Sequence, residues 1–206
     1  MEEINGFKRT VIGVGYIGCG EHSHKGLNGK TSKMYSAWSG MLKRCYSENY
    51  LDQNPTYVGC SVDPQWHDLQ NFAEWYKEQY KEDGWCLDKD ILMPHNKVYS
   101  PDNCCYVPQE VNKAVKLGHT DRTKLPVGVV AQTGACGVKF IAQIHIGRQY
   151  GKCLGVFDTP EEAHLVYCYA KEKHIKNLAE VKYSKVLRQD VKVAMINFKV
   201  SDRMIL

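Results

Sequence analysis

The sequence has no long hydrophobic run, and its N-terminus lacks the layout of a secretion signal. None of its apolar stretches approaches the roughly 18 residues that a membrane span needs. The chain begins MEEINGFKRT, with acidic side chains first rather than the basic-then-apolar order of a signal peptide. Hydrophobic residues make up 43% and charged residues 24% of the chain, as in a typical globular protein. We therefore expect a soluble, cytoplasmic protein without a membrane partner.

Paired cysteines are also missing, since none of the nine cysteines has a CxxC neighbour. An odd count without close pairs argues against a disulfide framework. A structural zinc on Cys45, Cys60, Cys104 and Cys105 stays open on residue type alone, but adjacent cysteines are awkward as paired ligands. The favoured interpretation is that these thiols are free, buried and packed like small apolar side chains.

The net charge is small, at +4 for 206 residues, but it is unevenly divided. Residues 1–112 carry 11 basic and 15 acidic side chains, whereas residues 113–206 carry 16 basic and 8 acidic ones. Such asymmetry suggests a nucleic-acid contact in the basic half, although a solvated lysine-rich surface gives the same count. A polar stretch between the halves predicts a first domain over 1–116, a linker over 117–124 and a second domain over 125–206.

In the first domain, residues 11–20 (VIGVGYIGCG) include a formal GxGxxG match. A dinucleotide site needs a strand before this motif and a helix directly after it, whereas the residues that follow are turn-like. We interpret the segment as a loop or extended arm. Apolar residues at helical spacing predict amphipathic helices over 35–46 and 66–80, with their aromatic side chains in a core.

Residues 86–114 have a pattern that could carry chemistry. Residues 87–92 are strand-like, residues 93–96 supply turn residues, and residues 97–99 resume an extended pattern, so we predict a β-hairpin. Pro108 then suits the first turn of a helix. The predicted order is strand, strand, helix.

These residues resemble the ββα-metal finger of phage-type HNH nucleases. The matching residues are Leu87-Asp88-Lys89-Asp90, then Tyr99-Ser-Pro-Asp-Asn103-Cys104, and then Asn112 on the helix. The resemblance implies a metal-dependent endonuclease of the homing type, which would nick or cut double-stranded DNA in a phage-infected bacterial cell. It also implies that Mg²⁺ or Mn²⁺ is held by Asp88 and Asn112, and that Asn103 pins the loop through backbone hydrogen bonds.

The chain departs from this family at the general base. Lys89 stands where the family usually has a histidine that activates water, and a protonated lysine cannot accept a proton. Three alternatives stay open: His95 in the hairpin loop acts as base, Lys89 itself acts after deprotonation by burial, or the finger has lost cleavage and kept DNA binding. The last would make the chain a DNA-binding regulator or an antagonist of host functions.

The second domain shows three extended runs, 125–132, 138–146 and 149–157, with glycines at or beside the turns. Polar and apolar residues alternate in the middle run, so one face can pack while the other meets a ligand. Thr159-Pro-Glu-Glu162 is a capping box that starts a helix. We predict an α+β protein whose second domain is a three-stranded antiparallel sheet backed by one helix; the structure of residues 184–206 is left open.

This pattern resembles the ethylene-response-factor type of DNA-binding domain, above all in Cys153-Leu-Gly-Val-Phe-Asp-Thr-Pro-Glu-Glu-Ala163 with Tyr167 and Ala170. The resemblance implies that the sheet enters the major groove of double-stranded DNA. An RNA-binding or protein-interaction role for the same sheet is a further alternative, and protein partners are unknown. The exposed strand residues expected to contact DNA are Gln132, Lys139, Gln143, His145, Arg148 and Lys152.

Overall fold

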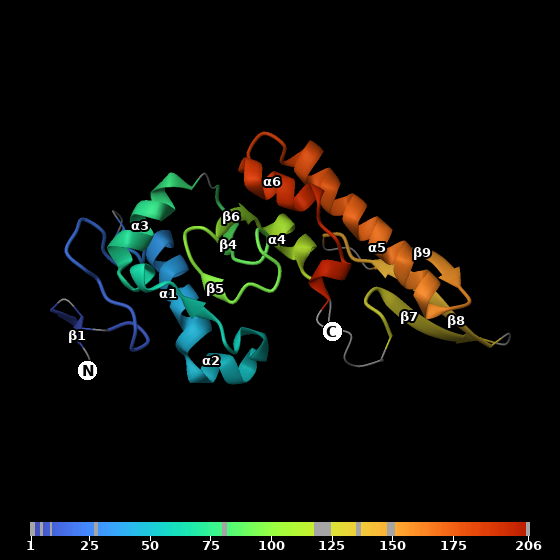
Figure 1. Ribbon diagram of the computed structural model, residues 1–206, viewed down its shortest axis with the longest axis horizontal. Coiled ribbons are helices and arrows are strands. Elements are labelled where there is room, and N and C mark those ends of the chain that lie inside the picture. The colour runs from blue at the N-terminus through green and yellow to red at the C-terminus, as the bar shows by residue number, and fades with distance from the viewer. Residues whose placement is uncertain are drawn as a thin grey trace. The chain divides into compact units, whose positions relative to one another are not determined.

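The computed structural model describes residues 3–4, 6–8, 10–26, 29–79, 82–117, 125–134, 137–147 and 151–204 (Figure 1). Backbone contacts divide the chain into two compact units, Met1–Val107 and Pro108–Leu206. The helix Gln109–Val115 belongs to the second unit by its contacts, although the sequence analysis grouped it with the first domain. The predicted linker, except for residue 117, lies outside the described residues.

Helices α1 (Lys33–Tyr46) and α3 (Leu69–Glu78) form the core of the first unit, close to where their aromatic stripes predict helices. The side chain of Ser32 caps α1, and that of Asp68 caps α3. Between them lie α2 (Glu48–Gln53), short 3₁₀ turns and the strand β3 (Ser61–Val62). The buried cluster contains Trp38, Met41, Leu42, Cys45, Cys60, Val62, Trp66, Leu69, Phe72, Tyr99 and Cys104.

The glycine-rich segment 11–20 is an irregular arm, as expected, and follows the short strands β1 (Glu3–Ile4) and β2 (Phe7–Lys8). It lies on α1 and on the start of α3. The amide of Gly18 donates to the carboxylate of Asp68 at 3.0 Å. A Cβ at Gly15 would meet a carbon of Leu42 at 2.4 Å, so a larger residue there would have to displace the side chains of α1. Gly15 therefore serves close packing of the arm on α1.

The strands of the finger-like segment pair differently from the predicted hairpin, and that part of the prediction is wrong. Strand β4 (Trp85–Asp88) pairs with β6 (Cys105–Pro108), while β5 (Val98–Tyr99) pairs in parallel with β3. The first strand stops early because the carboxylate of Asp88 accepts the N–H groups of Asp90 and Ile91, which a continuing strand would offer to a neighbour.

In the second unit, β7 (Val129–Gly134), β8 (Gly137–Ile144) and β9 (Lys152–Phe157) form an antiparallel sheet in that order. Helix α5 (Pro160–Asn177) packs on one face of the sheet (Figure 1). The predicted α+β class, with a three-stranded sheet on one helix, is thus confirmed. Gly128 turns the chain into β7 with φ at +81°, and a Cβ there would lie 2.1 Å from the ring of Tyr167.

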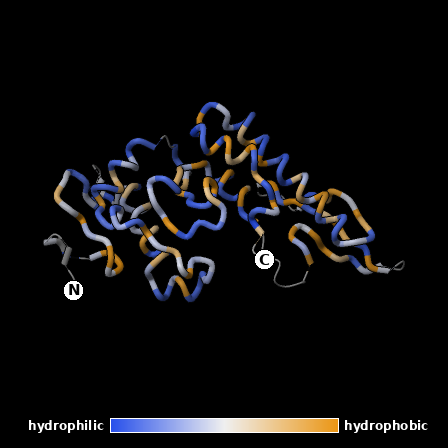
Figure 2. Tube along the Cα trace, in the orientation of Figure 1, coloured by the Kyte–Doolittle hydropathy of each residue, from blue (hydrophilic) through white to orange (hydrophobic). Residues whose placement is uncertain are grey.

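The second half of α5 packs on helices rather than on the sheet. Helices α4 (Gln109–Val115) and α6 (Gln189–Ile196) contact it, and a π-helical turn, Leu178–Lys182, joins its end. Residues 184–206 thus contain α6 and a short 3₁₀ turn, Ser201–Arg203. Apolar residues are interspersed with polar ones along both units (Figure 2), and no helix of the described residues is long and apolar enough to cross a membrane.

Candidate functional site

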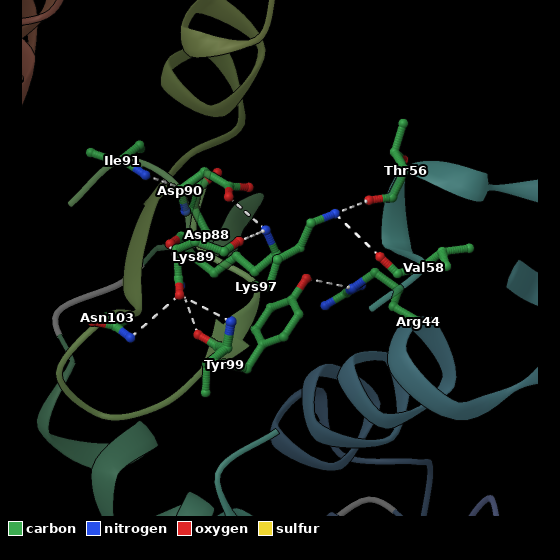
Figure 3. A network of polar contacts seen from close by, with 12 residues as sticks. Arg44, Thr56, Val58, Asp88, Lys89, Asp90, Ile91, Lys97, Tyr99 and Asn103 are labelled. Atoms are coloured by element: carbon green, nitrogen blue, oxygen red, sulfur yellow. Dashed lines mark hydrogen bonds and ion pairs between the residues drawn. The ribbon is translucent and has the colours of Figure 1, made fainter. Parts of the chain in front are cut away.

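The segment 88–103 holds most of the residues that the sequence analysis assigned to cleavage. Asp88, at the end of β4, is 5% exposed, and its Oδ1 accepts the N–H groups of Asp90 and Ile91, both at 2.8 Å (Figure 3). Asp88 therefore shapes the loop, and its carboxylate is a type of group that binds hard divalent cations.

Lys89 is buried at 7% exposure and is tied to the same loop. Its ammonium pairs with the carboxylate of Asp90 at 2.5 Å and donates to the carbonyl oxygen of Asn96 at 2.6 Å. The ring of Tyr99 lies 5.8 Å away, within cation–π range. An ammonium that donates to two acceptors is not placed to accept a proton from water, so this arrangement favours a structural role.

Asn96, which the sequence analysis did not single out, is the centre of the loop. Its side-chain amide donates to the carbonyl oxygens of Lys89 at 2.9 Å and Val98 at 2.7 Å, and its oxygen accepts the N–H of Val98 at 3.0 Å. Asn103, the residue expected to pin the loop, donates instead to the Asn96 side chain at 3.5 Å. Asn96 therefore holds the backbone of the loop in place of Asn103. The sequence signal that could have identified it is an asparagine at the end of the Pro-His-Asn turn.

Tyr99 joins the loop to α1. It is 3% exposed, its hydroxyl accepts from Nε of Arg44 at 3.1 Å, and the guanidinium lies 5.5 Å from its ring (Figure 3). Burial raises the pKa of Tyr99, although the neighbouring Arg44 opposes this. Lys97 connects the same segment to the carbonyl oxygens of Thr56 and Val58, at 3.0 and 3.3 Å. The network makes the loop part of the rigid core.

Two further residues proposed for cleavage have different surroundings. His95 is exposed in the turn closed by the bond from the Asn96 N–H to the carbonyl of Met93, and its φ of 58° is left-handed. Asn112 lies on α4 in the second unit and is 8% exposed. Among the residues that the structure describes, its amide has no hydrogen-bond partner. A buried asparagine in this state is a candidate ligand-binding group.

A group of oxygen and nitrogen ligands occurs elsewhere, in the arm and α3. Glu21, His22 and Glu74 bring their ligand atoms within 4.8 Å of one another, the one such group in the described part of the chain. Lys77 already pairs with both carboxylates, at 2.6 and 3.2 Å. It lowers the pKa of Glu21, while the hydrogen bond with His22 and then that with Lys77 lower the pKa of Glu74. The two carboxylates of this cluster therefore already have a positively charged partner, the ammonium of Lys77.

The cysteines weighed as zinc ligands are buried and carry free thiols. Burial raises the pKa of both Cys45 and Cys104 to about 12. A metal-binding cysteine acts as thiolate, so the protonated form that burial favours suits packing rather than metal binding.

The face of the β7–β8–β9 sheet away from α5 is a second candidate site, which we call the outer face. On the α5 side, Val129, Ala142 and Ala163 form a buried cluster. On the outer face, cross-strand register places Gln132 beside Lys139, Val130 beside Ile141 and Val156, and Gln143 beside Cys153. The sheet thus presents an apolar row between two rows with polar side chains.

The structure brings some of the six predicted DNA-contacting residues together and separates others. Gln132, Lys139 and Gln143 share the outer face, and His145 follows β8, exposed. Lys152 is in register with Ile144, which is buried at 2% exposure, because a bulge between Ala142 and Gln143 shifts the pairing. Lys152 therefore lies on the side of α5. Arg148 lies outside the described residues.

Charge on the outer face is low. The ammonium of Lys139 pairs with the carboxylate of Asp158, just after β9. Within the described residues, the side-chain amides of Gln132 and Gln143 have no hydrogen-bond partner. The face is therefore suited to a ligand that takes amide hydrogen bonds and apolar contacts.

Comparisons of the chain with protein-family models, with curated proteins and with solved structures found no match. The two family resemblances rest on the quoted residues.

Proposed function

We propose that the chain binds double-stranded DNA through the outer face of the β7–β8–β9 sheet. The observation that carries this proposal is a pair of glutamine side chains, the exposed Gln132 and the half-buried Gln143, on a face that α5 leaves uncovered. Residues 108–206 carry 16 basic and 9 acidic side chains, so the second unit as a whole attracts a polyanion. The resemblance to the ethylene-response-factor domain supports the same face.

The ion pair between Lys139 and Asp158 allows two substitutions with opposite expected effects on DNA affinity. Asp158→Asn should release Lys139 for a phosphate and remove a repelling charge, so that affinity for a short duplex rises at low salt. The slope of log K against log salt should steepen by about 0.9 if one phosphate contact is gained. Lys139→Met should weaken binding. Fluorescence anisotropy of the full chain measures both, and a wild type without affinity at low salt would refute the proposal.

Metal-dependent cleavage of DNA is the second candidate function. The specific observation in its favour is Asn112 on α4, a residue that is 8% exposed and whose amide lacks a hydrogen-bond partner in the described part of the chain. Asp88, its partner in the resemblance, belongs to the other unit. The resemblance to the HNH finger assigns both oxygens to one Mg²⁺ or Mn²⁺. These hard oxygen donors suit that ion, which when bound would stabilise charge on the leaving oxygen of a phosphodiester.

Asp88→Asn is the sharpest substitution for this candidate. An amide oxygen can still accept the N–H groups of Asp90 and Ile91, so the loop should persist, whereas the charge that holds the cation is lost. Asn112→Ala should have the same effect on activity. We expect both to abolish magnesium- or manganese-dependent plasmid nicking and to leave duplex affinity unchanged. Nicking that survives both substitutions would exclude this site.

The fixed position of Lys89 favours the alternative of a DNA-binding regulator or host antagonist with weak or no cleavage. Of the residues assigned to cleavage, His95 is the exposed one, and the imidazole is the usual base. His95→Asn keeps a residue that tolerates the left-handed backbone and removes the imidazole. If the wild type nicks DNA with His95 as base, this variant should be slower by about 10²-fold; equal rates would assign the base elsewhere.

A further inference from the structure

The outer face combines an apolar row with two amides. Val130, Ile141 and Val156 lie side by side on the three strands, and the two valines are 41% and 57% exposed. Gln132 lies two residues along β7 from Val130, and Gln143 lies two residues along β8 from Ile141. The apolar row therefore has one glutamine on each side.

Amides on both sides of an apolar row are complementary to the major-groove edge of A·T base pairs. In the major groove, adenine offers an acceptor and a donor that a glutamine amide can bind together, and thymine offers a C5-methyl group for apolar contact. Guanine is instead read mainly by arginine or lysine. The described outer face has no arginine, and its Lys139 pairs with Asp158.

The dimensions of the face are also compatible with a groove. Residues two apart along a strand are separated by about 6.8 Å, which is about two base-pair steps of DNA. Three strands place the ends of the apolar row about 10 Å apart, within the roughly 12 Å width of the major groove. The rows from Gln132 to Gln143 thus span a short run of base pairs.

We propose that the outer face recognises A·T base pairs in the major groove. The apolar row packs on thymine methyl groups, and the amides of Gln132 and Gln143 bind adenine. This inference rests on the proposed binding of duplex DNA by the same face and adds the class of sequence that it prefers.

The test compares short duplexes that share their flanks and differ in the centre: A·T, G·C, and A·T with every thymine replaced by deoxyuridine. Deoxyuridine removes the C5-methyl group and leaves pairing and the minor groove intact. We expect the full chain to prefer A·T over G·C by about tenfold or more. The loss from deoxyuridine should be about fourfold for each methyl that is buried.

Substitutions then test whether the apolar row is the part of the protein that contacts the thymine methyl groups. Val156→Thr keeps the side-chain shape and replaces one methyl group by a hydroxyl, so the ratio of thymine to deoxyuridine affinity should fall towards one. Val193→Thr on α6 is the matched control, because Val193 is 47% exposed and lies off the sheet; its ratio should equal that of the wild type.

Each outcome has a distinct meaning. Binding that is equal for A·T, G·C and deoxyuridine duplexes would overturn this inference while the proposed function stood. An A·T preference that deoxyuridine leaves unchanged would assign readout to the minor groove and also overturn it. A change of oligomeric state in Val156→Thr without any change in the affinity ratio would make the row a protein interface. Absence of duplex binding at low salt would instead refute the proposed function itself.

Discussion

The segment 88–103 and the outer face of the sheet contain similar polar residues in opposite surroundings. In the segment, Lys89 and Asn96 are 7% exposed and direct their polar groups at neighbours in the same unit. On the outer face, Gln132 and Gln143 have amides without partners in the described residues. Polar groups that already bond within the protein stabilise it, whereas amides without such bonds keep their donors and acceptor available to a ligand.

The comparison changes the weight of the two sites that the sequence suggests. The sequence assigns catalysis to segment 88–103, yet its lysine and its asparagines hold the loop together. The sheet unit carries the more specific motif, and its outer face also offers the more accessible chemistry. A site inferred from residue types has to be tested against what those side chains already bind.

The largest expected effect comes from Asn96→Ala. The substitution leaves two carbonyl groups and one N–H of the loop without their partner, those of Lys89 and Val98. Each such buried group costs about 1–3 kcal/mol, so the free energy of unfolding should fall by about 3 kcal/mol or more. Urea denaturation measures it. Gln132→Ala is the control and should change stability by less than about 0.5 kcal/mol; similar losses would erase the contrast between the two regions.

Two buried lysines sharpen the comparison. Lys89 has a carboxylate partner, whereas Lys171 on α5 is 7% exposed and, among the described residues, donates to the carbonyl of Lys116 alone, at 3.3 Å; burial lowers its pKa. Lys89→Met should cost about 2 kcal/mol because it leaves its acceptors unpaired. Lys171→Met should raise the free energy of unfolding by about 1 kcal/mol, because it removes a desolvated ammonium. Denaturant midpoints of the full chain report both, and the same sign for both would contradict the argument.

Helices α1 and α3 and the three-stranded sheet could be predicted because their signals are local. Apolar residues at spacings of three and four mark the helices, and alternation between glycines marks the strands. The partner of a short strand is not a local property. Strands β4 and β5 follow each other in sequence, but the Asp88 turn separates them and each pairs with a strand from elsewhere.

The site was less predictable because its geometry depends on single hydrogen bonds and on one irregularity. No pattern in the sequence indicates that Lys89 meets the carbonyl of Asn96. The bulge between Ala142 and Gln143 likewise leaves no mark in the alternation of residues, yet it moves Lys152 to the side of α5. Alternation along residues 138–146 put Gln143 on the face opposite to the buried Ala142 and Ile144, and the structure has it there.

The smallest expected effect concerns His174, which extends the contrast of paired and unpaired groups to acid pH. Burial, and then the charge of Lys171, lower the pKa of His174 below its ordinary 6.5. The folded state therefore binds this proton less readily than the unfolded state. The free energy of unfolding should keep its full value, as far as His174 determines it, above about pH 6.5. It should decline as the pH falls through the lowered pKa. Urea midpoints between pH 7 and pH 5 measure this decline, which His174→Gln should reduce; an equal decline in the variant would assign it to other groups.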